Sequence, residues 1–247
     1  MTIAARRSLN ALALTIVALT VAALLSESVR SFAAFVWVKF RGGYTVSERL
    51  GLHGQVVESR LRDQFAAVGL TYPPAELAYV SFKDTRKLEV YGRPSPEHPW
   101  RFVKEYPVLG LSGGLGPKLA DGDNQVPEGV YRAEFLNPNS RFHLSIRLNY
   151  PNDFDRRMAQ ADGRNRLGGD IMIHGSSASI GCLAMGDQAA EDLFILAALV
   201  TKERLLIVIS PTDFRAPSAF LSAAEPVWVN GLYGSLRTEL QQFRKGI

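Results

Sequence analysis

The segment from Ile173 to Met185 contains the residue types of a nucleophilic acyl-transfer site. It holds Cys182, the only cysteine of the 247-residue chain, and His174 lies eight residues before it. A thiol becomes a strong nucleophile when it loses its proton, and an imidazole within hydrogen-bond reach can accept that proton. The peptide between Gly181 and Cys182 adds backbone N–H groups of the kind that stabilise a tetrahedral oxyanion. The segment therefore offers a nucleophile, a base and an oxyanion hole.

The same residues allow two other interpretations. A single cysteine is most often a small buried hydrophobic residue. A cysteine and a histidine can also bind a metal, and Asp170 or His143 would then complete the ligand set. The glycine-rich segment 112–118 does not indicate a nucleotide site, because it lacks the Lys-Ser/Thr ending of a phosphate-binding loop. Catalysis by the thiol needs neither a metal nor another cofactor, and none is expected.

The run His174-Gly175 … Ser179-Ile180-Gly181-Cys182 resembles the active-site motif of L,D-transpeptidases (the YkuD-type catalytic domain). In that motif a histidine–glycine pair is followed by serine, any residue, glycine and cysteine. Further motifs resemble the YafK-like branch of the family in the same order, over roughly residues 75 to 212: Ser112–Lys118, Gly122-Asp123, Pro127–Tyr131, Asn137–Phe142 and Tyr150–Asn152. One departure is Ala184, which stands where many members carry an arginine.

The resemblance implies a chemistry for each residue of the motif. Cys182 would attack a carbonyl of a peptidoglycan stem peptide and form a thioester. His174 would be the base, and its neighbourhood is expected to lower the pKa of the thiol. The backbone at Gly181 would hold the oxyanion, with Gly175 and Ser179 in support.

The acceptor is left open by the sequence. An amine of a neighbouring stem peptide, or of a protein lysine, would make the protein a transferase. Water as the acceptor would make it a murein hydrolase or amidase that uses the same site. Two alternatives of another class are an inactive peptidoglycan-binding module and a metal-binding module that uses Cys182 and His174.

Four further residues are candidates for substrate binding. His143 lies on the polar face of a strand predicted over 142–149, where apolar and polar residues alternate strictly. Arg141 and Arg147 would face a carboxylate of the stem peptide. Tyr150, at the exit of this strand, completes the set.

Short apolar or alternating segments predict a mainly β or α+β catalytic fold with flanking helices. His174 would end a strand over 170–174, and Asp187 would cap a helix that runs to about Val200. The other predicted strands cover 77–83, 87–91, 100–108, 129–136 and 205–210, and two more helices are predicted over 46–69 and 230–245.

The N-terminus predicts a membrane segment. Arg6 and Arg7 precede eighteen uncharged residues, 8–25, which is long enough to span a bilayer. The arginines would stay inside, so the catalytic part would face the periplasm, anchored in the inner membrane. A cleaved signal peptide and secretion to the periplasm is the alternative. Four parts are then expected: anchor or signal with linker (1–40), helical connector (41–74), catalytic domain (75–215) and C-terminal helical extension (216–247).

The charge of the chain excludes one class of partner. The formal net charge is +4, of which the first thirty residues supply +2 through three arginines and one glutamate. No cluster of lysine and arginine indicates binding to nucleic acid.

Overall fold

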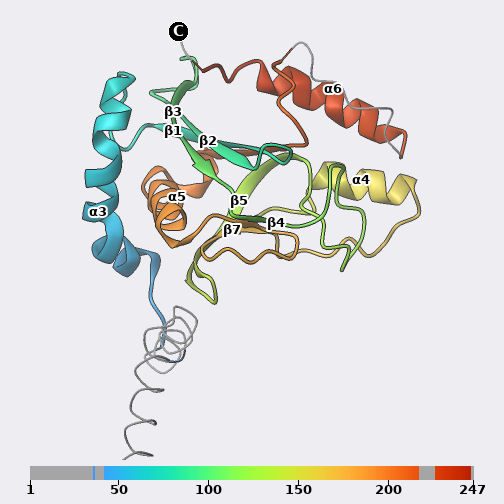
Figure 1. Cartoon of the computed structure of the whole chain (residues 1–247), viewed down its shortest axis with the longest axis horizontal. Coiled ribbons are helices and arrows are strands. Elements are labelled where there is room, and N and C mark those ends of the chain that lie inside the picture. The colour runs from blue at the N-terminus through green and yellow to red at the C-terminus, as the bar shows by residue number, and fades with distance from the viewer. Residues whose placement is uncertain (1–35, 37–41, 217–225, 246–247) are drawn as a thin grey trace, which may run out of the picture. The chain divides into compact units, whose positions relative to one another are not determined.

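A mixed sheet of nine strands organises the computed structural model, which describes residue 36 and residues 42–216 and 226–245 (Figure 1). The strand order is β3-β2-β1-β9-β5-β6-β7-β8-β4. The strands are β1 (Glu76–Phe82), β2 (Lys87–Arg93), β3 (Arg101–Pro107), β4 (Gly110–Leu111), β5 (Gly129–Ser140), β6 (His143–Leu148), β7 (Met172–His174), β8 (Leu183–Ala184) and β9 (Leu205–Ser210). The helices are α3 (Val46–Ala67), α4 (Asp153–Ala161), α5 (Asp187–Val200) and α6 (Trp228–Leu240), with a 3-10 turn, η1 (Lys202–Arg204).

The parallel pair β1 and β9 lies inside this sheet, between β2 and β5, and its two faces belong to two hydrophobic cores. Tyr79 and Ile207 are opposite each other and pack with α3 and α5. Val80 and Val208 point to the other face, where α6 covers them. A strand buried on both faces reads as a continuous apolar run, which is the sequence pattern of β9.

Helices α3, α5 and α6 cover the two faces of the sheet (Figure 1). Helix α3 begins at a capping box in which Thr45 and Glu48 satisfy each other's backbone N–H groups. Every third or fourth residue of α3 faces the core: Val57, Leu61 and Phe65. Helix α6 buries Val229, Leu232, Leu236 and Leu240 in the same way on the opposite face.

The mainly β architecture with flanking helices confirms the fold class, and the predicted strands and helices all occur, with ends that differ by a few residues. Sequence patterns missed α4, which is short, charged and buries a single residue, Ala159. They also missed the two-residue strands β4 and β8. The prediction that Asp187 caps α5 is wrong, because Gly186 precedes the helix and the Asp187 carboxylate instead accepts a hydrogen bond from the Ser176 N–H at 2.8 Å.

The predicted membrane segment lies outside the described residues. Among the residues that are described, no helix is long and apolar enough to cross a membrane. Helices α3 and α6 belong to the same unit as the sheet, Thr45–Ile247.

Asp155 makes the stability of this fold depend on pH. Its carboxylate accepts a hydrogen bond from the Asn152 N–H at 2.9 Å within the capping box of α4, and the Tyr131 hydroxyl lies 3.4 Å from it. Burial raises the pKa of Asp155 to about 6, above the ordinary 3.8. The folded state therefore favours the protonated acid, and this contribution is complete below pH 3.8 and is lost as the pH rises through 6.

We predict that the stability of the wild type relative to Asp155→Asn falls by about 1 kcal/mol between pH 5 and pH 7.5. Urea unfolding of both proteins at both pH values measures this double difference, in which the titration of all other groups cancels. An unchanged difference would mean that Asp155 titrates normally in the folded protein.

Candidate active site

The pairing of β7 with β8 brings the chain just after Cys182 alongside the strand that ends at His174. These strands are parallel, with His174 opposite Ala184 and Ile173 opposite Leu183. Cys182 comes two residues before Ala184, so its side chain leaves the sheet on the same side as that of His174. Ile173 and Leu183 point to the opposite face and anchor both strands in the core.

His174 is held in one tautomer. The side chain is only 2% exposed, and Nδ1 lies 2.5 Å from the Gly175 carbonyl oxygen. A carbonyl can only accept, so Nδ1 carries the proton and Nε2 is left as the basic nitrogen. Burial lowers the pKa of His174, although the hydrogen bond to Gly175 opposes this. The imidazole is therefore neutral at pH 7 and able to accept a proton.

Close packing around Gly175 fixes the orientation of this imidazole. The ring of Phe142 stacks on His174 with centroids 4.8 Å apart and planes at 28°. The N–H of Gly175 donates to the Phe142 carbonyl oxygen at 3.0 Å. A Cβ at position 175 would come within 2.5 Å of the Asp187 carboxylate and 2.8 Å of the Phe142 carbonyl, so only glycine fits. Packing thus accounts for the glycine that follows His174 in the motif.

The surroundings of Cys182 favour the protonated thiol over the thiolate. The thiol is half-buried, and its S–H donates to the Asp170 carbonyl oxygen at 3.6 Å. Burial raises the pKa of Cys182; a backbone hydrogen bond at Met172 opposes this most, the negative charge of Asp170 adds to the rise, and Lys118 opposes it. The expectation that the site lowers this pKa is therefore wrong for the free protein, because desolvation of the thiolate is the largest influence. The pair rests as neutral thiol and neutral imidazole.

Two serine hydroxyls accept hydrogen bonds from the backbone N–H groups beside the thiol. The Cys182 N–H donates to Ser179 Oγ at 3.1 Å, and the Ser179 hydroxyl donates to the Cys182 carbonyl at 2.6 Å. The Gly181 N–H donates to Ser112 Oγ at 2.5 Å. Gly181 has φ +92°, a conformation that favours glycine and turns its N–H toward Ser112. Hydroxyls thus lie where an oxyanion would be bound.

Sequence reasoning did not assign a role to Ser112. Its segment, 112–118, resembles a family motif, and the residue types within it indicate no specific role for the hydroxyl. Strand β4 pairs with β8, with Leu111 opposite Leu183, and this pairing places Ser112 beside the loop that contains Ser179. Nothing local in the sequence indicates this pairing, since both strands are two residues long.

The four residues predicted to bind substrate lie in different surroundings. Arg141 is exposed in the turn between β5 and β6. Arg147 pairs with Glu134 at 3.0 Å and with Asp170 at 3.2 Å, next to the carbonyl that accepts the Cys182 S–H. Their role in substrate binding stays a prediction.

The other two candidates are engaged in contacts of their own. Tyr150 is buried, and its hydroxyl donates toward the carbonyls of Lys118 and Leu167 at 3.4 and 3.3 Å. His143, also considered as a third metal ligand for Cys182 and His174, instead contacts Glu191. Asp170 offers its backbone rather than its carboxylate to the thiol.

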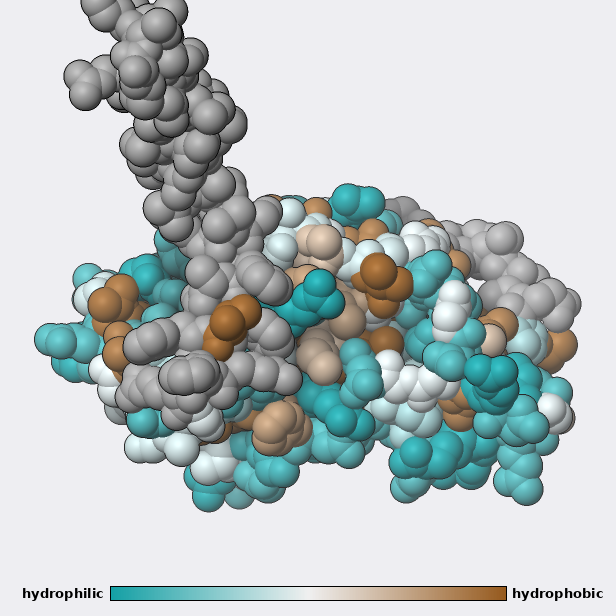
Figure 2. Space-filling model, turned by 90° about the horizontal axis from the view of Figure 1, so that it is seen from below, coloured by the Kyte–Doolittle hydropathy of each residue, from teal (hydrophilic) through white to brown (hydrophobic). Residues whose placement is uncertain are grey.

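The surface on this side of the molecule is mainly hydrophilic. Figure 2 views the molecule from below Figure 1, the side on which β4 and β7 lie, and shows small hydrophobic groups separated by hydrophilic ones. Ile180, in the loop between His174 and Cys182, is 79% exposed. A peptide with charged and polar groups is compatible with such a surface.

Comparison with known proteins identifies the region that contains the site. The sequence model of the L,D-transpeptidase catalytic domain (YkuD) matches residues 86–209, half of the chain. The chain is 37% identical over 123 residues to an Escherichia coli K12 protein named "Putative L,D-transpeptidase YafK", and the match covers 48% of this chain and 47% of that protein. The chain therefore spans about half the length of the curated relatives it matches.

The solved structures to which the chain is similar include one from Campylobacter jejuni and one from Bdellovibrio bacteriovorus. The helical cell shape determining protein Pgp2 from Campylobacter jejuni is 21% identical, with a TM-score of 0.44 over 56% of this chain and 48% of that chain. Bd1075 of Bdellovibrio bacteriovorus is 24% identical, with a TM-score of 0.41 over 70% of this chain and 57% of that chain.

We predict that the rate of Cys182 alkylation by iodoacetamide rises with pH through an inflection above about 8.5, the ordinary value for cysteine. The reason is that burial disfavours the thiolate. Because the chain has no second thiol, the mass of the adduct reports on Cys182 alone. The same protein unfolded in urea is the matched control and should titrate near 8.5. An inflection well below the control value would indicate a preformed thiolate–imidazolium pair.

Proposed function

Since the chain belongs to the L,D-transpeptidase catalytic domain family, we propose that it is a peptidoglycan-modifying cysteine acyltransferase. Its donor is a stem peptide, its nucleophile is Cys182 and its base is His174. The single observation that carries the proposal is that β7 pairs in parallel with β8, so that His174 lies opposite Ala184, two residues after Cys182, with the imidazole fixed as the Nδ1–H tautomer.

The first half of the reaction forms a thioester. His174 Nε2 takes the proton of the Cys182 thiol as Sγ attacks the carbonyl carbon of an L-residue in the stem. The tetrahedral intermediate collapses when the imidazolium gives this proton to the leaving amine of the terminal D-residue. Deprotonation coupled to attack suits a site whose thiol is protonated at rest.

The second half transfers the acyl group to an amine. A neighbouring stem peptide supplies it, or a protein lysine does so. His174 Nε2 takes a proton from the amine nitrogen as this nitrogen attacks the thioester, and then returns the proton to Sγ. A base that has given up its proton at the end of the first half is ready for this step.

The oxyanion of both tetrahedral intermediates is assigned to the N–H groups of Cys182 and Gly181. In the free protein these groups donate to Ser179 and Ser112. An oxyanion accepts such bonds more strongly than a neutral hydroxyl does. Exchange of serine oxygen for substrate oxygen would therefore favour the transition state over the free enzyme.

The substrate places the reaction in the cell envelope, with the catalytic unit facing the periplasm. Anchoring through residues 8–25 is part of the same proposal. A reporter fused after residue 45 tests the orientation.

Replacement of Cys182 by alanine should abolish product formation, because the chain has no other thiol on which a thioester could form. Purified full-length protein is incubated with muropeptides, and intact-mass spectrometry follows the acyl adduct while chromatography follows the products. Urea unfolding of the variant checks that the fold is retained. Turnover by Cys182→Ala near the wild-type rate would contradict the mechanism.

His174→Gln should lower kcat/KM by about 10² to 10⁴, the usual contribution of a general base. The matched control is His98→Gln, since His98 is exposed and hydrogen-bonds to Ser95. The control should keep wild-type activity. Equal rates for both variants would mean that another group removes the thiol proton.

The acceptor is determined by product analysis in the presence and absence of an added amine. Incorporation of the amine into the released acyl group supports transfer. Exclusive release of the free acid, unchanged by the amine, would replace transfer by hydrolysis at the same site.

A further inference from the structure

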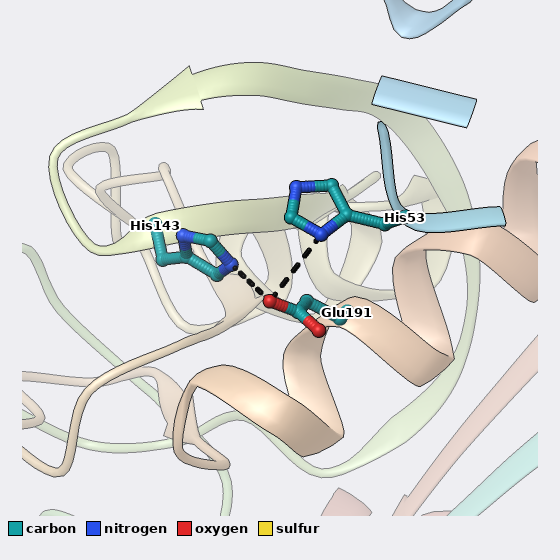
Figure 3. A group of neighbouring side chains, drawn as sticks. All are labelled: His53, His143 and Glu191. Carbon is teal, nitrogen blue, oxygen red and sulfur yellow. Dashed lines mark hydrogen bonds and ion pairs between the residues drawn. The ribbon is translucent and has the colours of Figure 1, made fainter. Parts of the chain in front are cut away.

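Two histidines and a glutamate meet at one point outside the motif (Figure 3). His53 comes from α3, His143 from the start of β6 and Glu191 from α5. Glu191 Oε1 lies 3.0 Å from His143 Nε2 and 3.4 Å from His53 Nδ1. The three side chains are 19–25% exposed, so the cluster is shielded but can be reached from solvent.

The chemistry and spacing of these atoms suit a metal ion. Two imidazoles and one carboxylate are a ligand set that zinc uses, with ligand bonds of about 2.0–2.2 Å. A tetrahedral ion with such bonds separates its ligand atoms by about 3.4 Å. The two separations from Glu191 are close to this value, and the ligand atoms of all three residues lie within 4.8 Å of one another. Small side-chain rotations would therefore complete the coordination.

The surroundings orient the carboxylate for this use. Arg60 binds Glu191 Oε2 at 3.1 Å and leaves Oε1 to face the histidines. Arg60 is itself held by Asp192, which is fully buried and also accepts a hydrogen bond from the Tyr106 hydroxyl at 2.8 Å. Residues that hydrogen-bond to the ligand side chains in this way commonly fix the geometry of metal sites.

We propose that His53, His143 and Glu191 bind one divalent transition-metal ion, with zinc as the preferred metal and water in the open fourth position. The ion would connect α3, β6 and α5. Imidazole-rich sites favour zinc and its neighbours over calcium and magnesium, which prefer oxygen ligands. The site is distinct from Cys182, so it does not depend on the proposed reaction.

Because of the position of His143, a bound ion would also affect the turn next to His174. His143 follows Phe142, whose ring stacks on the catalytic imidazole. It also has φ +69°, an uncommon backbone conformation for a side chain other than glycine. An ion that fixes His143 would thus hold the turn that supports His174.

Zinc titration of the full-length protein tests the proposal. The Cys182→Ala background is used so that the thiol does not compete for the ion. After treatment with a chelator, zinc is added, and retained zinc is measured by elemental analysis after gel filtration, together with Tm. We expect one zinc per chain and a higher Tm. His143→Gln and His53→Gln should weaken binding at least about tenfold, whereas His98→Gln should bind like the background.

Cobalt provides a second measurement that needs no variant at the site. The wild-type protein with Co²⁺ should show the visible bands of a tetrahedral ion with nitrogen and oxygen ligands. A thiolate-to-cobalt charge-transfer band would place the ion at Cys182 and overturn the proposal. Retention of no zinc, or equal retention by the background and His143→Gln, would overturn it as well and would leave a hydrogen-bonded cluster as the role of these residues.

Discussion

A buried ion pair between Lys83 and Glu128 connects the centre of the sheet to the loop beside the thiol. Both side chains are fully buried, and Lys83 Nζ lies 2.9 Å from Glu128 Oε1. Lys83 also donates to the carbonyls of Gly116 and Val126, and Glu128 accepts from the Gly116 N–H and, at 2.9 Å, from the Tyr233 hydroxyl of α6. Removal of one partner from such a pair leaves an uncompensated buried charge, which costs several kcal/mol. The segment that carries Ser112 is therefore held by the same interaction that joins β1, β5 and α6.

The register of β7 and β8 determines on which side of the sheet Cys182 and His174 lie. A shift by one residue would turn Cys182 to the opposite face of the sheet from His174, because side chains alternate along a strand. Ile173 and Leu183 prevent this shift, since both are buried in the core that also contains α5. The geometry of the candidate site and the packing of the core thus depend on the same pairing. The loop that contains the exposed Ile180 therefore runs between two buried strand residues, Ile173 and Leu183.

Burial has opposite effects on what the site can do at rest and during reaction. It keeps the thiol protonated and the imidazole neutral, so the free protein holds an unreactive pair. The same exclusion of water strengthens the hydrogen bonds from Cys182 and Gly181 to a developing oxyanion. Ser179 and Ser112 satisfy those N–H groups in the meantime, and this avoids the cost of leaving buried donors unpaired.

The sequence by itself determined the family and most of the strands and helices, and it predicted the candidate nucleophile and base. These depend on short-range features: the spacing of His174 and Cys182, and apolar patterns such as that of β9, which persist over several residues. Only the tertiary structure decided the protonation state of Cys182, the contact of Ser112 with the Gly181 N–H, and the meeting of His53 with Glu191. The protonation state of Cys182 depends on burial. The other two depend on strand pairing and helix packing between segments distant in sequence, which no local pattern encodes.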